Sequence, residues 1–211
     1  MVAETRLSTP RLGATRVKCI GLFYNMTNNT KIKYAKEYFR KAHNSIKQKR
    51  KYSGEPYWVH TEAVAQLVWN ATHDENLTIA ALGHDTLEDV APLNHQYDEY
   101  IMLKEFGEVI TNLVKELTNV YTKKTYPNLN RKQRKHLEHK RLSEISDDAK
   151  TIKLADIIDN VCGIAEQDSD FGRIFLLEKS QVLFGLKGGN SILYNKAIQS
   201  VNNEISKLNK K

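Results

Sequence analysis

The segment "ALGHDTLEDV", residues 81–90, places metal-binding and acidic side chains in a run whose apolar residues have the spacing of a buried helix. These side chains are His84, Asp85, Glu88 and Asp89. In one helix over residues 76–88 they would lie on adjoining faces, because residues three and four apart are neighbours on a helix surface. Burying several carboxylates together is unfavourable unless a cation or a proton neutralises them. A bound metal ion is therefore the simplest explanation of this segment.

A second polar interruption occurs in "DAKTIKLADIIDNVCGIAE", residues 148–166. Its apolar residues recur at helical spacing and predict a core-facing helix. Asp156 interrupts that pattern, and Asn160 follows it one turn later on the same face. We expect a metal-binding carboxylate and a substrate-contacting amide at these two positions.

One more imidazole is needed to complete a site, and His60 is the natural candidate. It closes "SGEPYWVH", residues 53–60, immediately before a helix expected over residues 61–71. Together with His84, Asp85 and Asp156 it would form a set of two histidines and two aspartates. Such a set suits divalent manganese, iron, zinc or magnesium and leaves coordination positions for water and a substrate oxygen.

The rest of the chain predicts an all-α fold, a bundle of about eight helices without internal repeats. Residues 1–30 lack helical or strand periodicity and are expected to be an N-terminal extension or arm, whereas residues 31–211 form the domain. The expected helices are 32–47, 61–71, 76–88, 101–119, 130–145, 148–166, 172–186 and 190–207.

Composition sets wide limits on function. The 211 residues are 40% hydrophobic and 27% charged, which is typical of one soluble domain, and the net charge of +7 favours an anionic partner. No run approaches the about 18 apolar residues of a membrane span, so no membrane partner is expected. The only cysteines, Cys19 and Cys162, have no CxxC or zinc-finger spacing. This pattern indicates no thiolate zinc site and fits a cytoplasmic protein.

Four motifs occur in an order that resembles a known family. They are "KRKYSGEPYWVH" (49–60), "AALGHDTLEDV" (80–90), "FGEVITNLVKELT" (106–118) and "IKLADIIDN" (152–160). The sequence resembles RelA/SpoT-type HD-domain hydrolases and their small stand-alone relatives, the small alarmone hydrolases that include the metazoan SpoT homologue. The resemblance implies an HD-domain helical bundle and a manganese-dependent enzyme that removes the 3′-pyrophosphate from the alarmone (p)ppGpp to give GDP or GTP. Another divalent metal could replace manganese.

The resemblance also implies roles for individual residues. It assigns metal binding to His60, His84, Asp85 and Asp156, catalysis to Glu88 and Asp89, and nucleotide contacts to Arg50 and Asn160. Lys51, next to Arg50, is expected to screen phosphate charge.

The sequence departs from the family pattern at three positions, of which only Phe175, with the basic segment described below, leaves the substrate open. Thr61 stands where the family usually has Pro, and Gly83 replaces a frequent Leu and is expected only to thin the local packing. Phe175 replaces a frequent Tyr on the nucleotide side, so substrate preference is open. The first alternative is the same metal chemistry on another nucleotide, such as ppApp, NADPH or an ordinary nucleotide. The second is a catalytically weak nucleotide-binding or antitoxin-like module.

One basic segment has no assigned role. Residues 131–141, "RKQRKHLEHKR", carry six lysines and arginines on one expected helix. A solvated helix face is the favoured interpretation, ahead of a phosphate-binding rim or a nucleic-acid patch. The expected partner is thus a small nucleotide rather than a nucleic acid, and no oligomeric state is predicted.

Overall fold

A computed structural model describes residues 29–210, and this part of the chain is helical with connecting turns. It contains no β-strand, only an isolated antiparallel bridge between Lys49 and Pro56. The all-α prediction is confirmed. Most of the expected N-terminal arm, Cys19 included, lies outside the described residues. Within the described part, no helix is long and apolar enough to cross a membrane.

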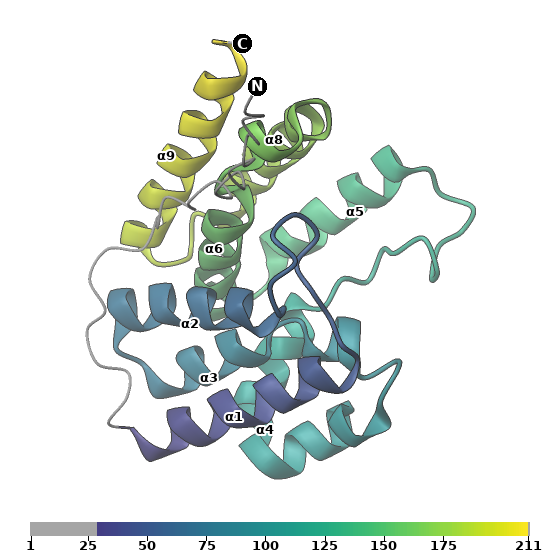
Figure 1. Cartoon of the computed structure of the whole chain (residues 1–211), viewed down its shortest axis with the longest axis vertical. Coiled ribbons are helices and arrows are strands. Elements are labelled where there is room, and N and C mark those ends of the chain that lie inside the picture. Colours follow the sequence, from purple (N-terminus) through teal and green to yellow (C-terminus); the bar gives the residue numbers. More distant parts are fainter. Residues whose placement is uncertain (1–28, 211) are drawn as a thin grey trace, which may run out of the picture.

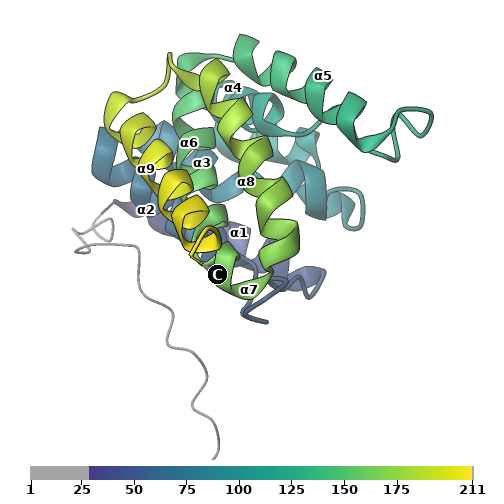
Figure 2. The same ribbon diagram turned by 90° about the horizontal axis from the view of Figure 1, so that it is seen from above.

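The helices form two groups (Figure 1). The first group packs around α3 and consists of α1 (Thr30–Ser45), α2 (Trp58–Thr72), α3 (Glu75–Gly83) and α4 (Glu99–Leu117). The second packs around α6 and consists of α6 (Asp147–Val161), α7 (Ile164–Gln167), α8 (Ser169–Leu183) and α9 (Ser191–Leu208). Seen from above, α5 (Arg131–Glu144) lies at the edge of the molecule, where it contacts α8 (Figure 2).

Helix α6 lies at the centre, in contact with α2, α3, α4, α8 and α9. Its buried residues include the apolar series from Ile152 to Val161, but also Lys153, Asp156 and Asp159. A charged group in such a position is stable only when it is paired or binds an ion. The polar residues of α6 therefore mark the site.

The helix expected over residues 76–88 is shorter than predicted. Helix α3 ends at Gly83, Asp85 has φ −99° and ψ 0°, and a π-helical turn follows over Thr86–Val90. In this turn the amide of Ala91 donates to the carbonyl of Thr86, five residues back, at 2.9 Å. Single π turns of this kind are frequent at functional sites. His84 and Asp85 thus occupy a helix break rather than the face of one continuous helix.

The expectation that Gly83 only thins the local packing was wrong, because the structure shows a close contact at this position. A Cβ atom built at Gly83 would lie 2.5 Å from Cζ of Phe39, a fully buried residue of α1. The missing side chain allows the Phe39 ring to pack directly against the end of α3. The glycine therefore brings α1 close to the position where His84 leaves the helix.

The helix expected over residues 148–166 is also divided. Helix α6 ends at Val161, and Gly163, with φ +79°, precedes the short helix α7. Glycine adopts this left-handed conformation without the steric cost that a Cβ atom adds. The other helices agree with the expected ranges to within a few residues.

Candidate active site

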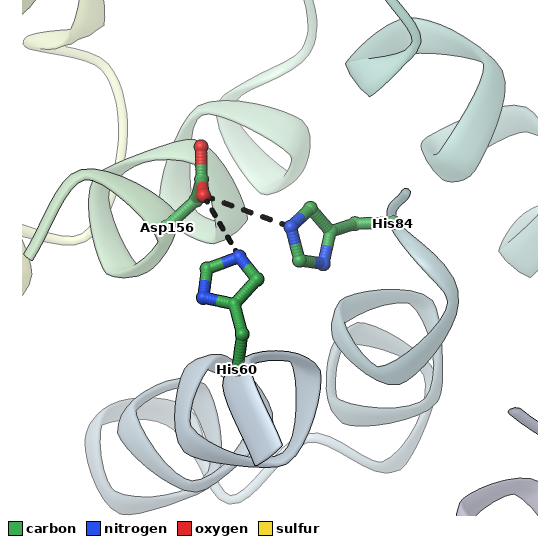
Figure 3. A group of neighbouring side chains, drawn as sticks. All are labelled: His60, His84 and Asp156. Atoms are coloured by element: carbon green, nitrogen blue, oxygen red, sulfur yellow. Dashed lines mark ion pairs between the residues drawn. The ribbon is translucent and has the colours of Figure 1, made fainter. Parts of the chain in front are cut away.

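Two imidazoles and a carboxylate converge where the two helix groups meet (Figure 3). His60 extends from the first turn of α2, His84 from the end of α3 and Asp156 from the middle of α6. Asp156 Oδ1 lies 3.3 Å from Nε2 of His60 and 3.7 Å from Nε2 of His84. One potential ligand atom from each residue lies within 4.8 Å of the others, and all three side chains are buried. This spacing fits a single metal ion.

Asp85 adds a second carboxylate to the cluster. Its Oδ2 lies 3.0 Å from Nε2 of His84 and 3.6 Å from Nε2 of His60. The hydroxyl of Tyr57 donates to the same oxygen at 2.6 Å. With 19% of its side chain exposed, Asp85 lies on the open side of the cluster, whereas the other three residues close its inner side. The structure thus brings together all four residues that the sequence predicts as ligands.

The hydrogen bonds of the two imidazoles leave their Nε2 atoms aimed at the centre of the cluster. Nδ1 of His60 is 2.7 Å from a carboxylate oxygen of Asp159, and Nδ1 of His84 is 2.9 Å from the carbonyl oxygen of Ala81. An acceptor at Nδ1 selects the tautomer whose Nε2 lone pair can bind a metal. Both Nε2 atoms are buried and, among the described residues, make no hydrogen bond of good geometry; the nearest polar atoms are the carboxylate oxygens of Asp156 and Asp85. A divalent ion would satisfy these two atoms, so the residues fit such an ion.

Charge compensation within the cluster agrees with this arrangement. Burial lowers the pKa of His84, but the carboxylates of Asp85 and Asp156 outweigh burial and raise this pKa well above its usual value. Burial would also raise the pKa of Asp156, but the ammonium group of Lys153, 2.8 Å from Oδ2, helps to hold it well below its usual value. Burial also opposes ionisation of Asp85, but the adjacent imidazolium of His84 lowers its pKa below the usual value. Both carboxylates are therefore ionised, and a nearby positive charge stabilises them. A metal ion supplies that charge when it replaces protons on its ligands.

Glu88 and Asp89 extend from the π turn beside the cluster. Glu88 accepts hydrogen bonds from the backbone amide of Asn119 at 3.1 Å and from its side-chain amide at 2.9 Å. Asp89 accepts one from the side chain of Gln48 at 2.7 Å. Burial, followed by the neighbouring Asp85 carboxylate, raises the pKa of Asp89 to about 6. Each carboxylate thus has its own anchor outside the turn.

A cavity of about 260 Å³ opens next to the cluster, and His60 forms part of its wall. Arg50, Lys51 and Asn160 also line it, together with the stacked rings of Phe171 and Phe175, whose centroids are 5.5 Å apart. The three residues predicted to contact substrate therefore share one cavity with a predicted metal ligand.

The polar residues in this cavity are tied to the cluster or to the cavity wall. Asn160 donates to Asp156 and Arg50 pairs with Asp159. Lys51 is 69% exposed, with its ammonium group 3.0 Å from the hydroxyl of Tyr52 and 3.7 Å from the carboxylate of Asp168. Lys51 therefore lies at the exposed rim, whereas Arg50 and Asn160 lie deeper.

Several residues around the site were missed by the sequence analysis. Asp159 could have been found, because it follows Asp156 by one helical turn in α6. The same spacing could have revealed Lys153, which precedes Asp156 by three residues in α6 and pairs with it. The remaining supporting residues carry no local signal, since they come from separate parts of the chain: Gln48, Tyr57 and Asn119.

Comparison with known proteins agrees with this site. The chain matches the family described as "HD domain" over residues 35–182. It belongs to the HD domain family. The protein is therefore a metal-dependent phosphohydrolase by family, and its His-His-Asp cluster fits the divalent metal that HD-domain hydrolases bind.

Two named relatives narrow the comparison. One, from Xenopus tropicalis, is named guanosine-3′,5′-bis(diphosphate) 3′-pyrophosphohydrolase MESH1 and is 33% identical over 162 residues, or 71% of this chain and 83% of that protein. Another, from Mycoplasma pneumoniae, is named a probable enzyme of the same activity and is 33% identical over 138 residues. That match covers 62% of this chain but only 18% of the much longer relative. The predicted resemblance to RelA/SpoT-type HD-domain hydrolases is confirmed.

A solved structure supports the same conclusion for the fold. The structure described as a metazoan ortholog of SpoT that hydrolyzes ppGpp superposes with a TM-score of 0.70 at 25% sequence identity. The match covers 86% of this chain and 98% of that chain. The predicted HD-domain helical fold is therefore confirmed over most of the chain.

Proposed function

We propose that the protein is a guanosine-3′,5′-bis(diphosphate) 3′-pyrophosphohydrolase, which removes pyrophosphate from (p)ppGpp and leaves GDP or GTP. The observation that carries the proposal is the convergence of two buried imidazole Nε2 atoms and two ionised carboxylates beside a cavity that contains Arg50 and Lys51. The choice of nucleotide follows from the names of the two relatives, which give guanosine-3′,5′-bis(diphosphate) as their substrate. The net charge of +7 agrees with a highly anionic substrate.

In this proposal His60, His84, Asp85 and Asp156 hold one divalent ion. Imidazole and carboxylate ligands together suit Mn²⁺, which is the metal we propose, although other divalent ions share this preference. When bound, such an ion lowers the pKa of a coordinated water and polarises a phosphate oxygen. Lys153 keeps Asp156 ionised for this purpose, and Tyr57 fixes the orientation of Asp85.

Hydrolysis requires that a water oxygen bonds to the phosphorus attached to O3′ of the ribose while the P–O3′ bond breaks. The water loses a proton, and O3′ takes one up as it leaves as a hydroxyl. Asp89 is the better placed acceptor for the water proton, because among the described residues only Gln48 donates to its carboxylate. Both oxygens of Glu88 accept from Asn119, so Glu88 orients the turn and the water rather than accepting the proton.

The cavity residues would bind the nucleotide. The Arg50 guanidinium offers five donors, of which Asp159 uses only part, and its plane can fork onto a phosphate. Lys51 at the rim would screen a more distant phosphate, and Asn160 would present its amide between Asp156 and the substrate. A cytoplasmic location and the lack of a nucleic-acid partner stay predictions.

A second candidate is the same chemistry on another nucleotide, such as ppApp or NADPH. The observation that favours it is the apolar wall of Phe171 and Phe175, since a stacked phenyl pair packs against any base and presents no hydrogen-bonding group to distinguish guanine. A binding module without turnover is disfavoured, because binding alone has no need for both a metal cluster and an adjacent pair of anchored carboxylates.

One experiment separates these functions. Purified protein with Mn²⁺ is offered ppGpp, ppApp, NADPH and simple nucleotides, and released pyrophosphate and phosphate are measured separately. We expect pyrophosphate from ppGpp with wild type and with Asp74→Asn, and at least a hundredfold less with Asp85→Asn. Asp74 caps the far end of α3, and asparagine caps equally well, so this variant is a matched control. Tight binding of ppGpp without any release would refute the proposal.

A further inference from the structure

Asp159 joins the metal cluster to the nucleotide cavity. Its side chain is only 6% exposed and extends from α6, one turn after Asp156. Its Oδ2 atom accepts from Nδ1 of His60 at 2.7 Å and also pairs with the guanidinium of Arg50. One buried carboxylate oxygen therefore contacts both a proposed metal ligand and a proposed substrate contact.

The contact with His60 determines how this imidazole faces the cluster. The ring lies between two carboxylates of α6, with Asp159 at Nδ1 and Asp156 at 3.3 Å from Nε2. A neutral imidazole donates at one nitrogen and accepts at the other. Only an acceptor at Nδ1 keeps the Nε2 lone pair directed at the ion. Without Asp159 the ring could adopt the other tautomer or rotate.

The contact with Arg50 anchors a long side chain that comes from outside the helix bundle. Arg50 lies in the connection between α1 and α2, where its amide donates to Glu55 and its carbonyl accepts from Gly54. Its side chain is 16% exposed and reaches α6 through the pair with Asp159. The guanidinium is thereby held at the cavity next to His60.

We propose that Asp159 is a positioning residue that orients His60 for the metal ion and Arg50 for the nucleotide. Carboxylates that accept from a metal-bound histidine raise metal affinity in this way. The second half of the inference rests on the proposed function, because it requires a nucleotide in the cavity. The first half requires only that the cluster binds a divalent ion.

The alternative is that Asp159 is only a buried ion-pair partner of Arg50 and matters for stability alone. The two explanations differ in metal affinity, which a stabilising ion pair with Arg50 would leave unchanged. They also differ in the response to asparagine. An asparagine keeps an oxygen that can accept from His60, but it loses the charge that holds Arg50.

The test is a titration of metal-free protein with Mn²⁺, in which free Mn²⁺ is measured by electron paramagnetic resonance and no nucleotide is present. We expect Asp159→Ala to raise the Kd for Mn²⁺ about 10- to 100-fold. Asp159→Asn should raise it less, but should increase KM for the nucleotide with a smaller change in kcat. Asp74→Asn is again the control and should behave as wild type in both measurements.

An unchanged Kd for Mn²⁺ in Asp159→Ala would overturn the inference. If that variant does not fold, as judged by circular dichroism, then an Asp159→Asn protein with the wild-type Kd and KM would overturn it instead. Failure of the proposed function would look different. Wild type would then bind Mn²⁺ in an Asp159-dependent manner but release no pyrophosphate from ppGpp, which refutes the substrate and supports the role of Asp159.

Discussion

The two segments that supply the acidic residues of the site, α6 and residues 84–90, do so in opposite ways. In α6 the helix is regular, and Asp156, Asp159 and Asn160 share a face because of their spacing alone. In residues 84–90 the α-helix has already ended, and a π turn determines where the side chains lie. The positions in α6 follow from local sequence, whereas those in the turn depend on contacts with distant residues.

These distant contacts identify what holds the turn in place. Phe39 packs against Gly83 before the break, Asn119 binds Glu88, and Gln48 binds Asp89. Each comes from a different part of the chain. We therefore expect changes in α6 to act through charge and metal binding, and changes around the turn to act through its geometry.

The largest effect is expected for Asp156→Asn in α6. The change removes a proposed ligand and leaves Lys153, whose side chain is 11% exposed, without its acidic partner. Breaking a buried ion pair costs about 3–5 kcal/mol, and loss of a catalytic metal costs several more in transition-state stabilisation. The free energy of unfolding, measured with urea in the presence of a chelator, should fall by about 3 kcal/mol or more. The value of kcat/KM, measured with Mn²⁺, should fall by about a thousandfold. Asp148→Asn, an exposed change on the same helix, should alter neither.

On the turn, Asp89→Asn should reduce kcat by about 10²- to 10⁴-fold, as expected when a general base is lost. Its affinity for Mn²⁺ should remain close to that of wild type, since Asp89 lies outside the four proposed ligands. Kinetics and the Mn²⁺ titration together check this. A comparable loss of Mn²⁺ affinity would instead make Asp89 a ligand and would weaken the distinction between the cluster and the turn.

Removal of metal should destabilise the folded protein. A ligand that binds only the native state at one hundred times its Kd contributes about 2.7 kcal/mol. Adding EDTA should therefore lower the Tm of wild type by several degrees, as measured by differential scanning calorimetry. Asp85→Asn should show a much smaller response, because one proposed ligand is already lost. An equal response in both proteins would place the stabilising ion elsewhere.

Gly83→Ala is expected to have the smallest effect, and it tests the packing that precedes the turn. The added methyl group would overlap with the buried Phe39 ring, and overpacking of this kind costs about 1–3 kcal/mol. Thermal unfolding should show this loss. Gly172→Ala in α8 is the matched control, because there a Cβ atom would be 3.4 Å from its nearest neighbour and alanine favours the helix.

The sequence was sufficient for those features that depend on local periodicity. It predicted the all-α class, most helix ranges, and the convergence of His60, His84, Asp85 and Asp156. It could not predict the end of α3 at Gly83, because the apolar pattern continues through Leu87 and the residues that anchor the following turn, Gln48 and Asn119, are distant in sequence. Nor could it predict Tyr57 at Asp85 or Asn119 at Glu88, since side-chain partners from distant segments have no spacing rule. The roles of the four ligands stay predictions until a metal is observed.

The central claim is that these four residues hold one divalent ion. Crystals grown with Mn²⁺ and measured at the manganese absorption edge test it directly. We predict an anomalous peak about 2.0–2.3 Å from Nε2 of His60, Nε2 of His84 and carboxylate oxygens of Asp85 and Asp156. Crystals that contain Mn²⁺ at saturating concentration but show no peak in this cluster would contradict the claim.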